Sequence, residues 1–300
     1  MKELARTLLF SPVGIYIVKA LRLVYRPVER HAGKLKFKGA FELKTTEGAR
    51  FRLYNNAFVF ETHLFWLGLQ HYSWERETRR IWNHLCPQSD VILDIGANSG
   101  IFAVLAKVYN PQATVVAFEP QPNIFYALTK NNSINDFDIR CENIALSDRS
   151  GRMPFYNYGP NTFTDVNTTA GSLNKNWRED RQSSIEVEVA TLKNYCETHQ
   201  IQNIDLIKMD VETHEFEVLL GYKDLLYRHR PLIILEVQNE VIGNRIQTLL
   251  EGTDYQFFNI HEQTGIRQVM KMGNDSGNHN YLLCPAEKIH QLSAFTSIAE

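Results

Sequence analysis

The chain has 300 residues, 44% of them hydrophobic and 11% aromatic, which suits one large domain or a domain with an appended segment. Its four cysteines are far apart in the sequence, which argues against a disulfide framework or a C-x-x-C zinc site and indicates a reducing compartment, the cytoplasm. The net charge is −2, but residues 1–38 carry +7 and the remaining residues −9, so the acidic body argues against a nucleic-acid binder.

Residues 1–38 are predicted to form a basic helical segment, with a helix beginning at Val13. Lys19, Arg22 and Arg26 recur at three- and four-residue spacing, so they share one helical face. Apolar residues occupy much of the remaining surface: Ile15, Val18, Leu21, Val24 and Tyr25. Proline, glycine and basic residues interrupt the apolar run, so neither a transmembrane span nor a signal peptide is predicted. The helix either packs on the main domain or lies in the plane of a membrane. In the second case its basic residues would face anionic head groups.

The next segment, residues 39–90, is predicted to be a hairpin and a helix packed on the core. In KLKFKGAFELKTTEGARFRLYNN, apolar and charged residues alternate on both sides of Glu47-Gly48, which is typical of an antiparallel hairpin. SWERETRRIWNHL has the spacing of an amphipathic helix.

In residues 91–290, strand and helix patterns alternate. Apolar runs predict strands at VILDI, ATVVAFEP, IRCENIAL, IDLIKMD and PLIILEV, and helices are predicted at NIFYALTKNN and EFEVLLGYKDLL. Two more strands, YQFFNI and NYLLCP, are predicted around a loop rich in glycine and asparagine. This order indicates an α/β fold with a mostly parallel sheet that is covered on both faces.

One stretch, from Met153 to Ala190, is polar, rich in asparagine and threonine, and without a clear period. A long aperiodic segment inside a compact domain is usually a functional loop. We therefore predict that the region from Asn157 to Ser184 is a lid that orders over bound acceptor and cofactor.

The glycine loop of VILDIGANSGIFAVLA indicates which class of nucleotide this fold holds. Aligned on Gly96, the dinucleotide fingerprint G-x-G-x-x-G meets Asn98 and Ile101 where its second and third glycines belong. A P-loop is absent too, because no G-K-[ST] follows. The loop therefore favours a ligand without phosphates.

Two carboxylates indicate more closely which ligand the loop binds. Glu119 ends the next predicted strand, nineteen residues after Gly100, where a carboxylate can accept hydrogen bonds from both ribose hydroxyls. Asp94, at the end of the first strand, can attract an ammonium group. A nucleoside with a free ribose diol, an ammonium group and no phosphate points to S-adenosylmethionine. The alternative is that both acids only cap turns.

Five motifs in order, DIGANSG, AFEPQP, ENIALSDRSG, LIKMDVETHEFEVLLG and PLIILEVQN, resemble the FkbM-type family of S-adenosylmethionine-dependent methyltransferases. The resemblance covers about residues 75–284. It implies the class I methyltransferase fold, a Rossmann-like seven-stranded sheet, mostly parallel, with an antiparallel last strand. It also implies O-methylation of a hydroxyl, often on a sugar of a polysaccharide, glycolipid or secondary metabolite.

The resemblance also implies site residues. Glu119 matches the acid that binds the ribose, and Asn143 lies in the region that borders the adenine. The residues that match the cofactor-binding loop are Asp94, Gly96, Asn98 and Gly100. Glu75 lies where the family often has an acid near the cofactor, although it could equally belong to a solvated helix face. The chain departs from the family at Thr213, which replaces the glycine of DVEG, and at TLKN, which lacks the usual aspartate.

The strand end LIKMDVETHE is the predicted catalytic centre, because ligands bind at the carboxyl ends of parallel strands. His214 is the candidate general base, with Asp210 or Glu212 to orient it or to bind sugar hydroxyls. The alternative is that these acids have no catalytic role and only stabilise the first turn of a helix by complementing its dipole. Asp210 and Glu212 would suit Mg²⁺, but the chain shows no dedicated cage and no metal is predicted. At the next strand end, Glu236 and Asn239 are candidate acceptor-binding residues.

Three functions follow from these patterns. The leading one is an S-adenosylmethionine-dependent O-methyltransferase whose acceptor is a small molecule or a glycan. A nicotinamide-dependent oxidoreductase would share the βαβ unit but needs the missing glycines. The third function is a non-catalytic module that binds S-adenosylmethionine for regulation. The sequence feature that favours it is Thr213, which replaces the glycine of DVEG.

Overall fold

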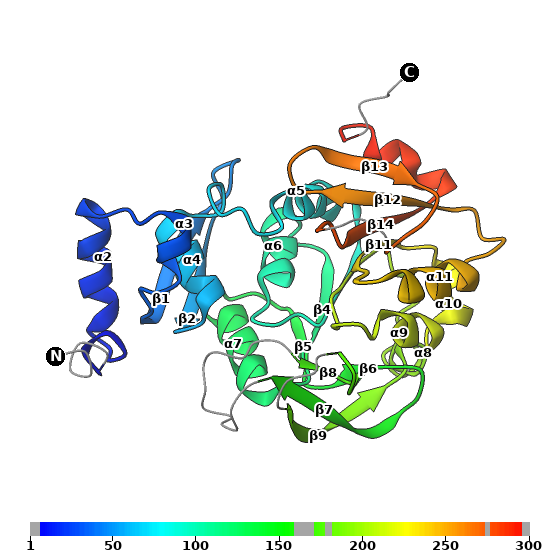
Figure 1. Cartoon of the computed structure of the whole chain (residues 1–300), viewed down its shortest axis with the longest axis horizontal. Helices are drawn as coiled ribbons and strands as arrows, with labels where there is room; N and C mark the ends of the chain where they lie inside the picture. Colours follow the sequence, from blue (N-terminus) through cyan, green and yellow to red (C-terminus); the bar gives the residue numbers. More distant parts are fainter. Residues whose placement is uncertain (1–6, 159–170, 178–181, 274–276, 296–300) are drawn as a thin grey trace.

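The computed structural model describes residues 7–158, 171–177, 182–273 and 277–295. Its largest element is an eight-stranded sheet in the order β13-β12-β14-β11-β10-β3-β4-β5 (Figure 1). Five neighbouring strands are parallel: β5 (Arg140–Glu142), β4 (Thr114–Phe118), β3 (Val91–Ile95), β10 (Leu206–Met209) and β11 (Leu232–Glu236). The antiparallel pairs involve β14 (Asn280–Pro285), β12 (Tyr255–His261) and β13 (Gly265–Val269).

The predicted α/β fold with a mostly parallel sheet is confirmed, and the last strand, β14, is antiparallel to its neighbours as expected. The predicted number of seven strands differs from the eight in the described part of the main sheet. The additional strand is β13, which pairs with β12 so that Gly265 lies opposite His261. It occupies part of the segment that was predicted to be a loop.

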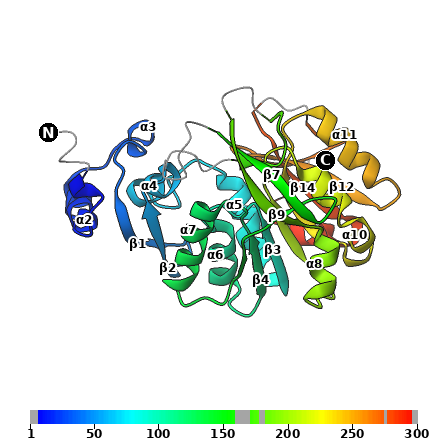
Figure 2. The same cartoon turned by 90° about the horizontal axis from the view of Figure 1, so that it is seen from below.

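Helices cover both faces of the main sheet (Figure 2). On one face lie α5 (Arg76–Leu85), α6 (Ile101–Tyr109) and α7 (Pro122–Ser133), and on the other α8 (Leu192–Thr198), α9 (Glu215–Leu220), α10 (Lys223–His229) and α11 (Glu240–Leu249). Successive strand residues alternate between the two apolar cores: Ile92 belongs to one and Leu93 to the other. Burial on both faces explains why these strands are continuous apolar runs. The described residues also form two short 3₁₀ helices, η1 (Cys86–Gln88) and η2 (Ala286–Leu292).

The N-terminal segments pack beside this sheet. They comprise α2 (Gly14–Val24), α3 (Glu29–Ala32), the predicted antiparallel hairpin β1 (Lys38–Lys44) and β2 (Arg50–Asn56), and α4 (Val59–Leu67). Asn131 and Asn135, in and just after α7, accept the backbone amides of Tyr54 and Arg52 at 2.7 Å each, which fixes the hairpin to the core. Among the described residues, no helix is both long and apolar enough to cross a membrane.

A second sheet, in the order β6-β9-β7-β8, includes both ends of the segment that was predicted to be a lid. Its strands are β6 (Ala145–Leu146), β7 (Gly151–Tyr158), β8 (Gly171–Ser172) and β9 (Gln182–Ala190), and β7 pairs with β9 along its whole length. The apolar side of this sheet is small, with Phe155, Val187 and Val189 among its few buried residues. That small cluster is why the sequence lacks a clear period here. The centre of the predicted lid, 159–170 and 178–181, lies outside the described residues.

Two predicted elements are each divided by the tertiary fold. IRCENIAL was predicted as one strand, but it forms β5 in the main sheet and β6 in the second sheet, because the chain crosses between them. EFEVLLGYKDLL was predicted as one helix and forms α9 and α10. The chain approaches Ser147 so closely there that a Cβ on Gly221 would lie 2.1 Å from the Ser147 carbonyl oxygen.

Candidate functional site

A cavity of about 390 Å³ lies at the carboxyl ends of β3, β4, β10 and β11. This volume is within the usual range for a small-molecule site. One part of its wall is aromatic: Phe60 comes from α4 and Trp74 from the segment before α5, and their rings meet edge to face at 4.6 Å. The N-terminal segments therefore help to build the site, which the sequence patterns did not indicate.

The glycine loop after β3 is shaped by a close backbone approach. Gly96 has φ 77°, and a Cβ there would lie 1.9 Å from the carbonyl oxygen of Asp210. The backbone amides of Gly96 and Ala97 both donate to the carbonyl of Phe118, at 3.0 and 2.9 Å. The loop is thus fixed to the ends of both neighbouring strands, and only glycine fits at its first position.

Glu119, at the end of β4, holds the same loop through its side chain. One carboxylate oxygen accepts the amide of Asn98 at 3.0 Å, and the other accepts the amide of Gln121 at 2.9 Å. Burial raises the pKa of Glu119 to about 7. The Ser99 amide donates to the Asn98 side chain at 2.8 Å, so two loop amides already have partners and do not form a phosphate cradle.

A buried lysine joins the two sides of the cavity. Lys208, on β10, is 1% exposed, and its Nζ lies 3.7 Å from Glu75 and 3.5 Å from Asp210. Asp94, on the neighbouring strand β3, accepts the amide of Ala103 at 2.9 Å. Burial raises the pKa of both Glu75 and Asp94 to about 7. The sequence patterns missed Lys208, although a lysine inside the apolar run LIKM was the available signal.

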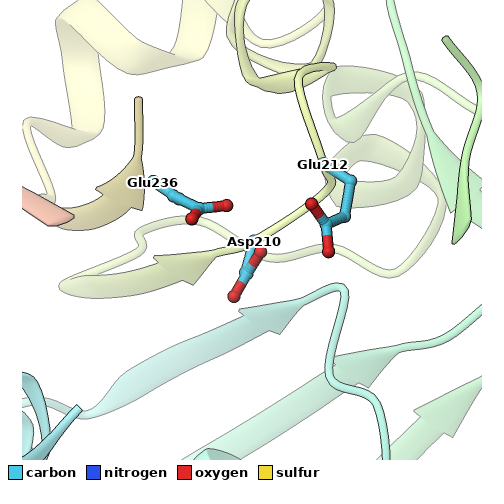
Figure 3. Close-up of side chains that lie close together, drawn as sticks. All are labelled: Asp210, Glu212 and Glu236. Atoms are coloured by element: carbon cyan, nitrogen blue, oxygen red, sulfur yellow. The ribbon is translucent and has the colours of Figure 1, made fainter. Parts of the chain in front are cut away.

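Three carboxylates converge at the ends of β10 and β11 (Figure 3). Oxygens of Asp210, Glu212 and Glu236 all lie within 4.8 Å of one another. Gln238 donates to both Glu212 and Glu236 at 2.9 Å. Such a group can bind the hydroxyls of an acceptor, and its oxygen ligands are also of the type that holds Mg²⁺.

The turn that carries these acids has an unusual backbone. Glu212 and Thr213 have φ 53° and 72°, a region in which a β-branched residue is strained. Glu215, fully buried, accepts the amides of Val211 and Thr213 at 3.2 and 3.3 Å. Asn174 donates to the Thr213 hydroxyl at 2.8 Å.

A second hydrogen bond holds the same turn: Ser172 donates to the Glu212 carbonyl at 2.7 Å. The second sheet therefore holds the acidic turn in place. The sequence patterns indicated neither Ser172 nor Asn174, because the contact joins segments that are about forty residues apart.

His214 lines the cavity, but its ring nitrogens contact other partners than those predicted. Nε2 shares a hydrogen bond of 2.8 Å with the Ser147 hydroxyl, and Nδ1 lies 3.8 Å from Glu217. Burial lowers its pKa, so the neutral imidazole is favoured. The expectation that Asp210 or Glu212 orients this ring is replaced by these two contacts.

Most predicted site residues are brought together by the structure. The lining residues include Glu75, Asp94, Gly96, Asn98, Glu119, Asp210, Glu212, His214 and Glu236. Three others support the site from outside the lining. Gly100 begins α6 and leaves room for Leu128, Asn143 donates to the carbonyls of Glu119 and Pro120, and Asn239 caps α11 by accepting the Ile242 amide.

The charge of the cavity is strongly negative. Six carboxylates line it, and Lys208 is the single lysine or arginine among its described lining residues. Clustered carboxylates disfavour a phosphorylated ligand and favour a cationic one. The arrangement therefore suits a ligand with positive charge beside a hydroxyl-bearing molecule.

Comparison with known proteins agrees with this geometry. A model of the methyltransferase FkbM domain matches residues 94–263, which include the glycine loop and all three converging carboxylates. The 31-O-demethyl-FK506 methyltransferase FkbM of Streptomyces tacrolimicus is 31% identical over 191 residues, which cover 54% of this chain and 71% of that protein. The 2-O-methyltransferase NoeI of Sinorhizobium fredii is 32% identical over 159 residues, 51% of this chain and 65% of NoeI. The hexuronic acid methyltransferase AglP of Haloferax volcanii is 25% identical over 176 residues, 59% of this chain and 67% of AglP.

Proposed function

Because this chain belongs to the FkbM methyltransferase family, we propose that it transfers a methyl group from S-adenosylmethionine to a sugar hydroxyl. The acceptor sugar belongs to a polysaccharide, a glycolipid or a glycosylated metabolite. The observation that carries the proposal is that Asp210, Glu212 and Glu236 converge on the cavity that Glu119 and Asp94 also line. The names of the relatives support it, since two specify O-methylation and one a hexuronic acid.

The residues on the β3–β4 side fit this cofactor. Glu119 would accept hydrogen bonds from the ribose diol, and Asp94 and Glu75 would face the ammonium and sulfonium charges. When bound, the cofactor supplies an activated methyl group. The lack of a phosphate cradle in the loop and the excess of carboxylates both disfavour a nicotinamide dinucleotide.

On the β10–β11 side, the chain has to orient a hydroxyl and take its proton. We assign the proton to Asp210, because its Oδ2 lies 3.5 Å from the ammonium of Lys208, which stabilises the ionised carboxylate. Asp210 would take the proton of the acceptor hydroxyl as its oxygen receives the methyl group, whose bond to the cofactor's sulfur would break to leave S-adenosylhomocysteine. Glu212 and Glu236 bind neighbouring hydroxyls of the sugar.

His214 remains the rival base in this proposal. Its Nε2 is engaged by Ser147, so proton transfer through this nitrogen would require that hydrogen bond to break. In our assignment His214 instead holds the acidic turn against the second sheet. The rings of Phe60 and Trp74 offer an apolar wall against which a sugar face can pack.

The test uses the full chain, isotopically labelled S-adenosylmethionine and a panel of glycosides that includes hexuronic acids. Mass spectrometry should detect a methyl group on a free hydroxyl, and the fully O-methylated form of the same glycoside should stay unlabelled. Calorimetry should show binding of S-adenosylmethionine and none of NAD. Cofactor binding without transfer to any hydroxyl acceptor would instead indicate a regulatory module.

A further inference from the structure

The N-terminal helix α2 packs on the rest of the chain through one face only. Ile15 and Val18 are buried, and the guanidinium of Arg22 lies 4.9 Å from the centre of the Phe65 ring. Arg22 is therefore partly buried against Phe65, although it was predicted to share one helical face with Lys19 and Arg26. In both views of the molecule, α2 lies at one end with the other described elements on one side of it (Figure 1, Figure 2).

The opposite side of α2 is a second apolar surface, here called the outer face. It consists of Tyr16, Ile17, Ala20, Leu23 and Val24, whose spacing of one, three and four residues places them on one side of the helix. Leu23 and Val24 are 87% and 86% exposed, and Tyr16 is 69% exposed. A helix with apolar residues on both sides is expected to be covered on both sides. The described part of the chain covers only one of them.

Positive charges lie at the border of the outer face and in the segment after the helix. Lys19 lies on its border, and exposed Arg26, Arg30 and Lys34 follow the helix. The whole 1–38 segment carries +7 against −9 for the rest of the chain. A second copy docked face to face would bring these basic residues together, whereas an anionic surface complements them.

We propose that the outer face of α2 docks on the surface of a bilayer that contains anionic lipids. The eleven residues of α2 span about 16 Å, far less than the hydrocarbon core of a bilayer, so the helix lies in the plane of the surface. Leu23, Val24 and Tyr16 enter the boundary between head groups and acyl chains, and Lys19 and Arg26 contact the head groups. This inference stands apart from the proposed methyl transfer, since it uses none of the cavity residues.

The test is co-sedimentation of the full chain with two kinds of vesicle, phosphatidylcholine alone and phosphatidylcholine mixed with phosphatidylserine. The chain should bind the mixed vesicles at low salt and should be released as salt rises. The double variant Leu23→Ser, Val24→Ser should bind at least about tenfold more weakly. The matched control is Val241→Ser, Met270→Ser, because these residues are 69% and 86% exposed and lie outside the N-terminal segment. It should bind like the natural chain.

The charge variant Lys19→Glu, Arg26→Glu should also lose binding to the mixed vesicles, and thermal unfolding should show that every variant is folded. The proposal is overturned if the natural chain ignores both kinds of vesicle at low salt, or if the control pair weakens binding as much as the α2 pair. It is also overturned if gel filtration shows a dimer that the α2 pair abolishes, because the outer face would then bind a second copy.

Discussion

The two sides of the cavity are assembled in different ways. The cofactor side comes mostly from one run of 26 residues, Asp94 to Glu119, in which β3, the glycine loop, α6 and β4 follow one another. The acceptor side takes Asp210 from the end of β10, Glu236 from β11 and Asn174 from the loop after β8. The first side is a local motif, and the second exists only after distant segments have met. Substitutions on the two sides should therefore differ in what they change.

The largest effect is expected where the two sides meet. Lys208→Met removes the ammonium that faces Glu75 and Asp210, so uncompensated buried carboxylates remain and the free energy of unfolding should fall by about 3–5 kcal/mol. Turnover should fall by about 10²–10³ because the electrostatic arrangement is lost. The measurements are urea unfolding and steady-state kinetics.

Lys107 offers the matched control. It is 3% exposed and donates to the carbonyls of Pro111 and Ala113, outside the cavity. Lys107→Met should destabilise the chain while kcat of the folded fraction stays unchanged. Equal kcat losses in the two variants would show that Lys208 serves only the fold.

The second prediction separates two residues of the acceptor side. Asp210→Asn should lower kcat by about 10²–10⁴ with little change in cofactor affinity, because it removes the proton acceptor. His214→Ala should lower kcat less and should keep the acidic limb of the pH–rate profile. A His214→Ala enzyme without that limb, beside an active Asp210→Asn enzyme, would assign the base to the imidazole.

The third prediction tests the cofactor side alone. Glu119→Gln weakens charge-assisted hydrogen bonds worth about 1.5–3 kcal/mol each, so affinity for S-adenosylmethionine should fall roughly tenfold or more. Acceptor KM should change little. The control is Glu142→Gln, since Glu142 ends the next strand, binds the Tyr195 hydroxyl and does not line the cavity. Unchanged calorimetric affinity in Glu119→Gln would remove the ribose assignment.

The buried carboxylates of the cofactor side make both the stability of the chain and its affinity for the cofactor depend on pH. Burial raises the pKa of Glu75, Asp94 and Glu119 to about 7, so the folded chain binds more protons than the unfolded chain. Their contribution to stability is therefore complete below about pH 4 and is lost as pH rises through about 7. A cationic ligand favours the ionised carboxylates, so cofactor binding should tighten over the same range and release protons. Calorimetry in buffers of different ionisation enthalpy measures this, and proton uptake would contradict it.

The smallest effect is expected at Thr213. Thr213→Gly relieves a left-handed backbone strain of about 1–3 kcal/mol but loses the hydrogen bond from Asn174. Stability should change by no more than about 1 kcal/mol, and acceptor KM should rise because the acidic turn loses its link to the loop after β8. Asn174→Ala should raise KM similarly, and the double variant should add little. Additive effects would show that the link does not position the turn.

The comparison also shows where prediction from sequence succeeds. Strands β3, β4, β10 and β11 were predicted because each is an apolar run buried on both faces. The pairing of β7 with β9 was not predicted, because the small cluster at Phe155, Val187 and Val189 gives the sequence little periodicity. Lys208 was missed because a single lysine in an apolar run does not reveal which carboxylates face it.

The sequence by itself determined the family, the parallel sheet and the identity of the acids at its strand ends, because local motifs and strand order specify these. Only the tertiary structure decided which acids meet. It placed Arg22 against Phe65, gave His214 the partners Ser147 and Glu217, and used Asn239 as a helix cap. The physical reason is that hydrogen bonds and ion pairs act over a few ångströms, so a side chain's partners depend on how distant segments pack.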